Sequence, residues 1–520
     1  MGHTRPVTTG PTAEHVEHPW RALIALCLGF FMILVDTTIV SIATPALMAD
    51  LDANVTQALW ITSGYLLAYA VPLLVTGRLG DRFGPRRLYL TGLAVFTAAS
   101  LACGLSSTLA GLVAARVVQG LGAACMTPQT MAIITRTFPA ANRGRAMSLW
   151  GATAGVASLV GPALGGVLLV SAGWPWIFFV NIPVGIVAFA LAWRFVPVQE
   201  RHPPRFDWLG VALSAAGTFL VVFGIQEGET FSWGAIAGPV QIWHLIAAGV
   251  LLLLAFVATQ SRRREPLLPL ALFRDRNFSL ASLGITAVGA TVAAHALPFI
   301  LYGQNARGWS ALEVALIMAP SAVLGGVLAP VAGRLVDRVH PRYVGGVGLA
   351  LFSLSLVWLA LLMRADAPPV WVFLFPFALL GVANAGTWSP LSTTATRNLP
   401  GAWAGAGSGF YNTSRQMGSV LGSAAIAALL TARLAAHLPG TTTGATPPTT
   451  ADAAAHTSAA VDAAGTAVDA AGGLPPGLID SYGAAMAEAM ILPAAVVLVA
   501  WVCALCFERP GHLGPRRPRA

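Results

Sequence analysis

Long apolar runs separated by short polar segments dominate the chain. A helix that crosses the hydrocarbon core of a bilayer needs about 20 mostly apolar residues, and fourteen runs of roughly this length or more follow one another. They cover residues 20–48, 57–77, 88–106, 110–135, 145–171, 176–196, 208–227, 241–260, 278–302, 312–333, 343–364, 370–395, 406–433 and 483–507. The pattern predicts an all-α polytopic membrane protein with fourteen transmembrane helices.

The composition agrees with a chain made mostly of membrane spans. Hydrophobic residues make up 56% of the sequence and charged residues 10%, whereas soluble domains carry about 25% charged residues. The net charge of +9 comes from 30 arginines against 21 acidic residues, with no lysine. These values exclude a soluble enzyme, a disordered chain and a disulfide scaffold, and they predict no nucleic-acid partner.

The five cysteines all lie in apolar runs, so no extracellular disulfide framework is expected. Cys503 and Cys506 form a C-x-x-C pair, but no second pair or histidine cluster accompanies it. We interpret both as small packing residues and predict neither a metal nor a cofactor. The remaining cysteines are Cys27, Cys103 and Cys125.

The placement of arginines predicts the orientation. If the N-terminus is inside the cell, 25 of the 30 arginines fall on cytoplasmic segments or their edges, as the positive-inside rule requires. Residues 1–19 and 508–520 are therefore predicted to be cytoplasmic tails. Two arginines, Arg116 and Arg415, lie inside predicted helices.

A short motif occurs twice along the chain. Residues 77–87 join the second and third predicted helices, and residues 333–342 join the tenth and eleventh. Identical residues of the two copies, among them Gly, Arg, Leu, Asp and Arg, fall at one offset of 256 residues. The duplication predicts two similar six-helix halves, residues 20–196 and 278–507, with residues 208–260 as an inserted two-helix hairpin. In transporters built from such repeats, the substrate site lies between the repeats near the bilayer midplane.

Seven segments together resemble one known family. Residues 77–87 match its G-x-L-x-D-R-x-G-R-R signature except at Pro85, residues 116–124 resemble its proton-coupling motif, and residues 161–166 resemble the end of its antiporter motif. Residues 36–45 depart from its helix-one signature at Ser41 and Thr44, and residues 174–185, 206–210 and 412–418 are also similar. The chain thus resembles the major facilitator superfamily, and within it the fourteen-helix drug:proton antiporter subfamily.

This resemblance implies the major facilitator fold, with two six-helix pseudo-repeats plus the inserted hairpin. It also implies a monomer in the cell membrane of a bacterium, whose partners are small-molecule substrates and protons. Gly161, Pro162, Gly165 and Gly166 match the antiporter motif and are expected to form a seam of close helix packing. The alternative is that Gly161 and Gly165 mark a dimerisation contact.

Asp36 and Arg116 are charged residues within predicted spans. A charge at the centre of a membrane helix costs about 2.5–3.5 kcal/mol on insertion scales, so such residues are expected to pair, to be hydrated or to function. We predict that Asp36 is a protonatable carboxylate whose pKa depends on engagement with Arg116. The alternative is a permanent ion pair that never titrates.

Six further polar residues are candidates for the substrate cavity. For Glu227 the alternative is a solvated helix end, for His295 a packing residue, and for Arg415 a structural role. Glu488 is expected near the outer end of the last helix, where it either reaches the surface or binds cationic drugs. The six candidates are Gln119, Glu227, His295, Tyr411, Arg415 and Glu488.

The duplicated motif is also expected to act in conformational change. Its glycines permit tight turns and close approach, and Asp81 can accept hydrogen bonds from helix amides or pair with cytoplasmic arginines. We predict a conformational latch on the cytoplasmic side; the alternative is a charged loop that only sets the topology. The latch residues are Gly77, Asp81, Arg82, Gly84, Gly333, Asp337 and Arg338.

Residues 434–482 are rich in Ala, Thr, Gly and Pro. They cannot bury a core, and we predict a mostly disordered external loop with transient helix over residues 453–471.

Asp50 and Asp52 suggest an alternative class of protein, an enzyme, because the pair resembles the acidic residues in the first external loop of membrane glycosyltransferases. The loop that follows is short, and no large external catalytic domain is visible.

The sequence as a whole predicts a proton-coupled antiporter that exports hydrophobic or cationic drugs or antibiotics, and not an enzyme. No P-loop is visible, so the proton gradient and the membrane potential would drive transport. Within transporters, the alternative is a dedicated exporter of one endogenous metabolite or lipid.

Overall fold

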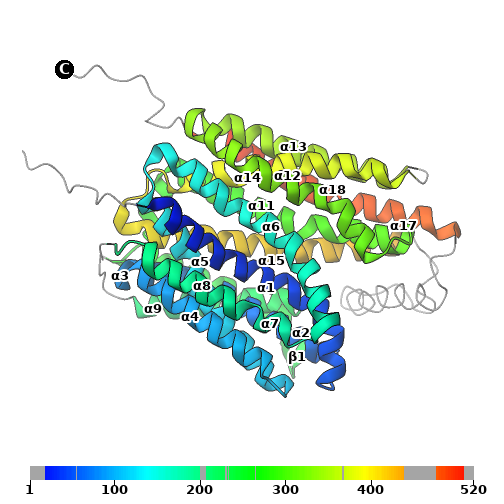
Figure 1. Ribbon diagram of the computed structural model, residues 1–520, viewed down its shortest axis with the longest axis horizontal. Helices are drawn as coiled ribbons and strands as arrows, with labels where there is room; N and C mark the ends of the chain where they lie inside the picture. Colours follow the sequence, from blue (N-terminus) through cyan, green and yellow to red (C-terminus); the bar gives the residue numbers. More distant parts are fainter. Residues whose placement is uncertain are drawn as a thin grey trace, which may run out of the picture.

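The structure is a computed structural model, and it is a long bundle of helices that lie side by side (Figure 1). It describes residues 18–53, 55–199, 207–228, 231, 233–263, 265–365, 368–437 and 476–508. Helix α1 begins and α18 ends at the same end of this bundle, which we call the terminal end. We call the opposite end the far end.

The N-terminal half is built from α1 to α8. Its helices are α1 (Pro19–Asp50), α2 (Val55–Ala70), α3 (Leu73–Phe83), α4 (Pro85–Gly104), α5 (Leu109–Thr137), α6 (Ala140–Ala172), α7 (Trp176–Phe179) and α8 (Asn181–Phe195).

The inserted hairpin and the C-terminal half follow. The hairpin consists of α9 (Trp208–Gln226), β1 (Ala235–Ala237), β2 (Val240–Gln241) and α10 (Ile242–Gln260), and β1 pairs with β2 in antiparallel orientation. The C-terminal half has α11 (Arg276–Leu301), α12 (Ala311–Arg338), α13 (Pro341–Met363), α14 (Leu374–Thr396), α15 (Ala404–His437), α17 (Pro476–Ala489) and α18 (Ile491–Leu505). Short turns η1 (Leu270–Arg274), η2 (Tyr302–Ala306), η3 (Val370–Phe373) and η4 (Gly401–Trp403) precede or extend its helices.

The described helices lie at all fourteen predicted spans. Twelve of them are long and apolar enough to cross a membrane, and the bent pair α2 and α3 makes a thirteenth. Helix α6 occupies the remaining span, and its stretch Ala163–Ala172 is a shorter apolar helix. The fold is therefore the all-α membrane architecture that the apolar pattern predicts.

Three spans are divided by short breaks, between α2 and α3, between α7 and α8, and between α17 and α18. Helices α2 and α3 meet at 46°, and Pro72 stands at the break. Proline has no backbone N–H and its ring collides with the preceding turn, so a continuous helix through this position is disfavoured. The last span divides into α17 and α18 at Met490, and its helix starts earlier than the predicted residue 483.

The duplicated motif is helical, which corrects the prediction that it forms loops. Residues 77–83 are the last part of α3, and residues 333–338 are the last part of α12. Only Gly84, with φ +95°, separates α3 from α4. A left-handed residue ends a helix at little cost when it is glycine, so the turn needs a single residue rather than a loop.

The predicted external loop is also shorter than its sequence suggests. Residues 434–437 belong to α15 and residues 476–482 belong to α17. The predicted transient helix over residues 453–471 lies outside the described residues.

Contacts between the halves run mainly along four helix pairs. Helices α3 and α5 pack against α15, and α6 packs against α12 and α14. In the hairpin, α9 packs on α10 and also reaches α2 and α15. The buried positions of α10 are Ile242, Gly249, Phe256 and Gln260, at spacings of seven, seven and four residues. Only one stripe of this helix therefore faces protein, and the rest faces lipid.

Candidate functional site

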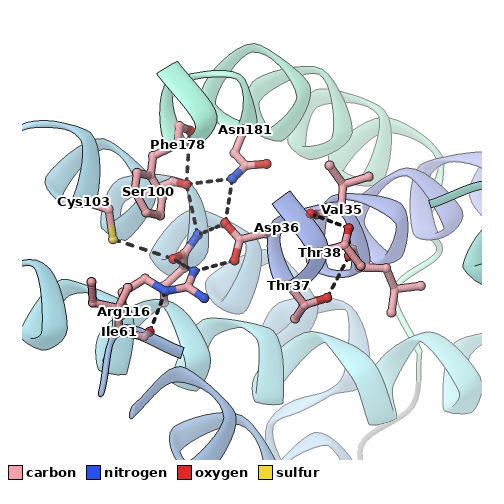
Figure 2. Close-up of polar contacts among 12 residues, drawn as sticks. Val35, Asp36, Thr37, Thr38, Ile61, Ser100, Cys103, Arg116, Phe178 and Asn181 are labelled. Carbon is pink, nitrogen blue, oxygen red and sulfur yellow. Dashed lines mark hydrogen bonds and ion pairs between the residues drawn. The ribbon is translucent and has the colours of Figure 1, made fainter. Parts of the chain in front are cut away.

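Four helices of the N-terminal half converge on one fully buried carboxylate. Asp36 lies in the middle of α1, Ser100 on α4, Arg116 on α5, and Asn181 is the first residue of α8. All four residues are at most 2% exposed. Their side chains point toward one another between the helices (Figure 2).

Both oxygens of Asp36 accept hydrogen bonds. Arg116 Nη1 donates to Oδ2 at 2.5 Å, and Oδ1 accepts from Gln119 Nε2 at 2.8 Å and from Asn181 Nδ2 at 3.0 Å. Ser100 Oγ accepts from the same two amide nitrogens and donates to the Phe178 carbonyl oxygen at 3.3 Å. Asp36 and Arg116, predicted as a coupled pair, are therefore in direct contact.

The orientation of these donors fits an ionised carboxylate. Gln119 Oε1 accepts from Arg116 Nη1 at 2.6 Å, and because a guanidinium only donates, the amide nitrogen of Gln119 must face Asp36. Each of the three groups on the Asp36 carboxylate thus brings a hydrogen. A proton added to the carboxyl would remove the negative charge toward which these donors are directed.

Arg116 is held on its other sides by α2. Its Nε donates to the Ile61 carbonyl oxygen at 3.2 Å, and its guanidinium carbon lies 4.1 Å from the centroid of the Tyr65 ring. A cation over an aromatic face is attracted by the ring quadrupole, more strongly where water is absent. Removing one partner of such a buried ion pair typically costs about 3–5 kcal/mol, so the pair is a strong local constraint.

A line of contacts continues from this pair to the other half. Tyr65 stacks on Tyr69 with ring centroids 6.2 Å apart, and Tyr69 Oη lies 3.2 Å from Thr127 Oγ1. Arg415 on α15 donates from Nη2 to Tyr69 Oη at 3.4 Å. Arg415, a predicted cavity residue, therefore meets the N-terminal half through Tyr69.

Asp81, at the end of α3, contacts the first turn of α15. Its Oδ1 accepts from Gly405 N at 2.9 Å and its Oδ2 from Ala406 N at 3.0 Å. Arg136 Nη2 donates to Asp81 Oδ1 at 2.8 Å and to the Gly401 carbonyl oxygen at 2.8 Å. A carboxylate at a helix N-terminus satisfies free amides and complements the helix dipole.

Asp337, at the end of α12, makes the corresponding contact with the first part of α6. Its Oδ1 accepts from Gly144 N at 2.7 Å and its Oδ2 from Arg145 N at 3.2 Å. Ser389 on α14 donates to the Gly144 carbonyl oxygen at 2.9 Å. The two motif copies thus join opposite halves at the terminal end, each through an aspartate and the beginning of a helix.

The motif glycines allow these helices to touch. A Cβ atom on Gly77 would lie 2.4 Å from the Gly405 carbonyl oxygen, and one on Gly333 would lie 2.8 Å from that of Gly144. Both separations are shorter than any real Cβ contact. Gly84 instead makes the turn, and Arg82 lies 5.4 Å from the Phe83 ring centroid. Arg338 is the last residue of α12.

Two more arginines, Arg143 and Arg397, lie at the terminal end. Arg143 on α6 donates from Nη1 to the Thr396 carbonyl oxygen at 3.2 Å, and from Nη2 to that of Thr135 at 2.8 Å. Burial lowers the pKa of Arg397, which directly follows α14, to about 10, so its guanidinium remains charged at neutral pH.

The predicted antiporter seam lies between α6 and α1. A Cβ on Gly161 would collide with Thr38, and one on Gly165 would lie 2.7 Å from Ile39 Cγ1. A Cβ on Gly166 would meet no atom of the described residues within 4 Å. The side chain of Pro162 lies outside the described parts. Gly161 and Gly165 therefore serve packing within one chain at this seam.

The acidic candidates Glu227 and Glu488 both lie near helix ends, but their surroundings differ. Glu227 ends α9 but is only 3% exposed, so the interpretation as a solvated helix end is wrong; α9 packs against α2 and α15 there and excludes water. Glu488 lies near the far end, 18% of its side chain is exposed, and three basic side chains surround it. It contacts Arg364 at 2.6 Å, Arg433 at 3.2 Å and His437 at 3.3 Å.

The remaining candidates stand apart from the Asp36 cluster. His295 uses its Nδ1 on the backbone carbonyls of Thr291 and Val292, both at 3.1 Å. The Tyr411 hydroxyl is buried and has no hydrogen-bond partner within the described residues. His295 is thus satisfied by its own helix, as its packing interpretation requires, and Gln119 is the candidate that the fold brings to Asp36.

The Asp50 and Asp52 pair is not arranged as a metal site. Asp50 Oδ2 accepts from Trp174 Nε1 at 2.6 Å, and Asp52 occupies a turn with φ 49°. Among the residues that the structure describes, no group of three or more metal-ligating side chains could hold an ion.

Several residues of the site carry little signal in the sequence. They are Ser100, Tyr65, Tyr69 and Arg136, together with Asn181, which is notable only as part of a family-like segment. Buried amides and hydroxyls in apolar spans are a weak signal, because many bond only to their own helix. Which of them face Asp36 depends on helix rotation, and the apolar pattern does not define that rotation.

Comparison with known proteins identifies the family. The model of the Major Facilitator Superfamily matches residues 26–423. An uncharacterized MFS-type transporter of Mycobacterium tuberculosis is 50% identical over 424 residues, which cover 81% of this chain and 72% of that protein. The tetracenomycin C resistance and export protein of Streptomyces glaucescens is 34% identical over 428 residues, covering 82% and 78%.

The fold agrees with this family. The crystal structure of the human organic anion transporter MFSD10 aligns with a TM-score of 0.55 at 12% identity, over 94% of this chain and all of that one. The chain belongs to the Major Facilitator Superfamily. It is a multi-pass plasma-membrane transporter of small molecules and not an enzyme, so the glycosyltransferase interpretation is wrong.

Proposed function

We propose that this chain is a proton-coupled antiporter that exports hydrophobic or cationic compounds, including antibiotics, and acts as a monomer with both termini in the cytoplasm. The observation that carries the proposal is the Asp36 carboxylate, which is fully buried and surrounded by hydrogen-bond donors. A relative named as an antibiotic resistance and export protein supports the class of substrate and the direction of transport.

Proton coupling follows from competition between a proton and the Arg116 guanidinium for the Asp36 carboxylate. In the ionised form, Arg116, Gln119 and Asn181 all donate to the carboxylate. Protonation removes the negative charge that holds Arg116 and leaves a buried cation without its partner, which is costly in a low-dielectric site. The state in which Arg116 is engaged is therefore favoured by deprotonation, and a different arrangement of α1 and α5 is favoured by protonation.

Alternation between two openings requires the terminal end to open and close. Asp81 and Asp337 hold the first turns of the opposite half in the described arrangement. These contacts are hydrogen bonds at helix ends, which can break and reform without unfolding a helix. In this proposal the described arrangement is closed toward the cytoplasm, and the membrane potential adds about 2.3 kcal/mol per charge per 100 mV to the driving force.

Transport by purified protein in proteoliposomes tests the proposal. A panel of lipophilic cations, neutral antibiotics and organic anions is offered with and without an imposed pH gradient. We expect gradient-dependent accumulation of hydrophobic compounds, loss of that accumulation when an ionophore collapses the gradient, and the same loss in the Asp36→Asn variant. Exchange that is unchanged after the gradient collapses contradicts proton coupling, and movement of a single metabolite alone contradicts a broad substrate range.

A further inference from the structure

A charged cluster at the far end of the C-terminal half lies outside the proton-coupling site. Arg364 directly follows α13, Arg433 and His437 are on α15, and Glu488 is on α17. The two guanidinium groups and the histidine ring surround the one carboxylate within 3.3 Å. The arginines alone carry two positive charges against one negative charge, so the cluster keeps an excess of positive charge.

The arginines keep donors for another anion. Their side chains are 52% and 47% exposed, whereas that of Glu488 is 18% exposed. Each contact with Glu488 uses one terminal nitrogen, and a guanidinium has five N–H donors in a planar fork that suits phosphate oxygens. An anion can therefore approach from outside while Glu488 stays in place.

The cluster borders an open groove that is apolar on its other side. The groove has a volume of about 430 Å³ and lies between α15 and the junction of α17 and α18. Leu429, one helical turn from Arg433, lines it together with Ile491 and Leu492, which begin α18. On both sides of the groove, charged residues thus stand one turn farther from the terminal end than apolar ones.

The position along the helices matches the boundary of the hydrocarbon layer. Glu488 lies 17 residues before Leu505, the last residue of α18, or about 25 Å at 1.5 Å per residue. The hydrocarbon core is about 30 Å thick. With Leu505 at one edge of this core, the charged rim lies within about 5 Å of the other edge, from where the long side chains of Arg364 and Arg433 reach the headgroups, and the apolar lining lies at the level of acyl chains.

We propose that this groove binds the phosphodiester headgroup of an anionic membrane lipid, with Arg364 and Arg433 on the phosphate and with Leu429, Ile491 and Leu492 along the first part of an acyl chain. The planar fork of a guanidinium matches the oxygens of a phosphodiester group. The size of the groove and the order of charged and apolar side chains along it fit a lipid. A free phosphate would leave the apolar lining exposed.

Native mass spectrometry of the full-length protein tests the site. The protein is released from detergent in the presence of phosphatidylglycerol, phosphatidylcholine or inorganic phosphate, and the bound mass is measured. We expect retention of phosphatidylglycerol and a loss of affinity of about 10- to 30-fold in the R364Q/R433Q variant, at about 1 kcal/mol per arginine. The matched control R194Q/R342Q removes two exposed arginines at the terminal end and is expected to bind like the wild type.

The E488Q variant separates this proposal from a purely structural ion cluster. It removes the competing carboxylate and leaves both arginines, so lipid binding is expected to stay equal or become tighter. Three results would each overturn the proposal: equal retention of phosphatidylcholine and phosphatidylglycerol, equally tight binding of inorganic phosphate alone, or loss of phosphatidylglycerol binding in E488Q. An unchanged affinity in R364Q/R433Q would overturn it as well.

Discussion

Arg116 and Asp36 are 80 residues apart in the chain and 2.5 Å apart in space, with their side chains 1% and 0% exposed. Neither charge can be removed alone without leaving the other uncompensated. This relationship makes α1 and α5 respond together to any change in the charge of Asp36.

The first prediction concerns this pair. Asp36→Asn should lower the free energy of unfolding by about 3–5 kcal/mol, because it leaves Arg116 as an unpaired buried cation, and should abolish proton-driven transport. Adding Arg116→Gln should restore much of the stability but none of the proton coupling. Thermal unfolding and gradient-driven uptake measure the two effects separately, and retained coupling in the double variant would contradict the role of Asp36.

The second prediction concerns the contacts at the terminal end. Gly77→Ala and Gly333→Ala each place a Cβ against the backbone of the opposite half, so both should shift the protein toward an arrangement that is open at this end. Distances between spin labels on the two halves measure the shift. Gly326→Ala, on α12 as Gly333 is, meets its nearest atom at an ordinary 3.5 Å and should leave the distances unchanged.

The third prediction concerns the aspartates of the same contacts. Asp81→Asn and Asp337→Asn keep the shape of the side chain but lose its charge at a helix N-terminus, an interaction that contributes up to about 2 kcal/mol when partly buried. Each variant should populate the open arrangement more, and the double variant more than either. If the label distances match those of the wild type, the contacts do not hold the closed end.

The fourth prediction concerns Tyr69, which joins Arg415 to the N-terminal half. Tyr69→Phe removes the hydroxyl and keeps the stack on Tyr65, so transport should fall by about 2- to 10-fold, as expected from the loss of one hydrogen bond of about 1 kcal/mol. Tyr89→Phe is the control, because its hydroxyl donates to the Ala25 carbonyl oxygen within the same half. Equal effects of the two substitutions would indicate a general cost of losing a buried hydroxyl.

The fifth prediction concerns the seam between α1 and α6. Gly165→Ala would bring a Cβ within 2.7 Å of Ile39 Cγ1, whereas Gly166→Ala meets no atom within 4 Å. The first should lower both the unfolding temperature and the transport rate, and the second should change neither. Similar behaviour of the two variants would show that the close contact at Gly165 is unimportant.

The apolar spans, the repeated motif and the family can all be read from the sequence alone. Apolar length is set by the thickness of the bilayer, so it can be read without knowing any contact. The rarity of charges in these spans also pointed to Asp36 and Arg116, because each such charge carries a large insertion cost.

Tertiary structure decided which side chains meet. The apolar pattern does not fix how each helix is rotated in a bundle whose helices are surrounded by lipid on one side and protein on the other. Only packing brings Ser100, Gln119 and Asn181 to Asp36. Packing also makes the segment at Asp81, predicted as a loop, the end of a helix that contacts α15. Contacts between residues far apart in the chain depend on the geometry of all the helices together, and that geometry is absent from any local pattern.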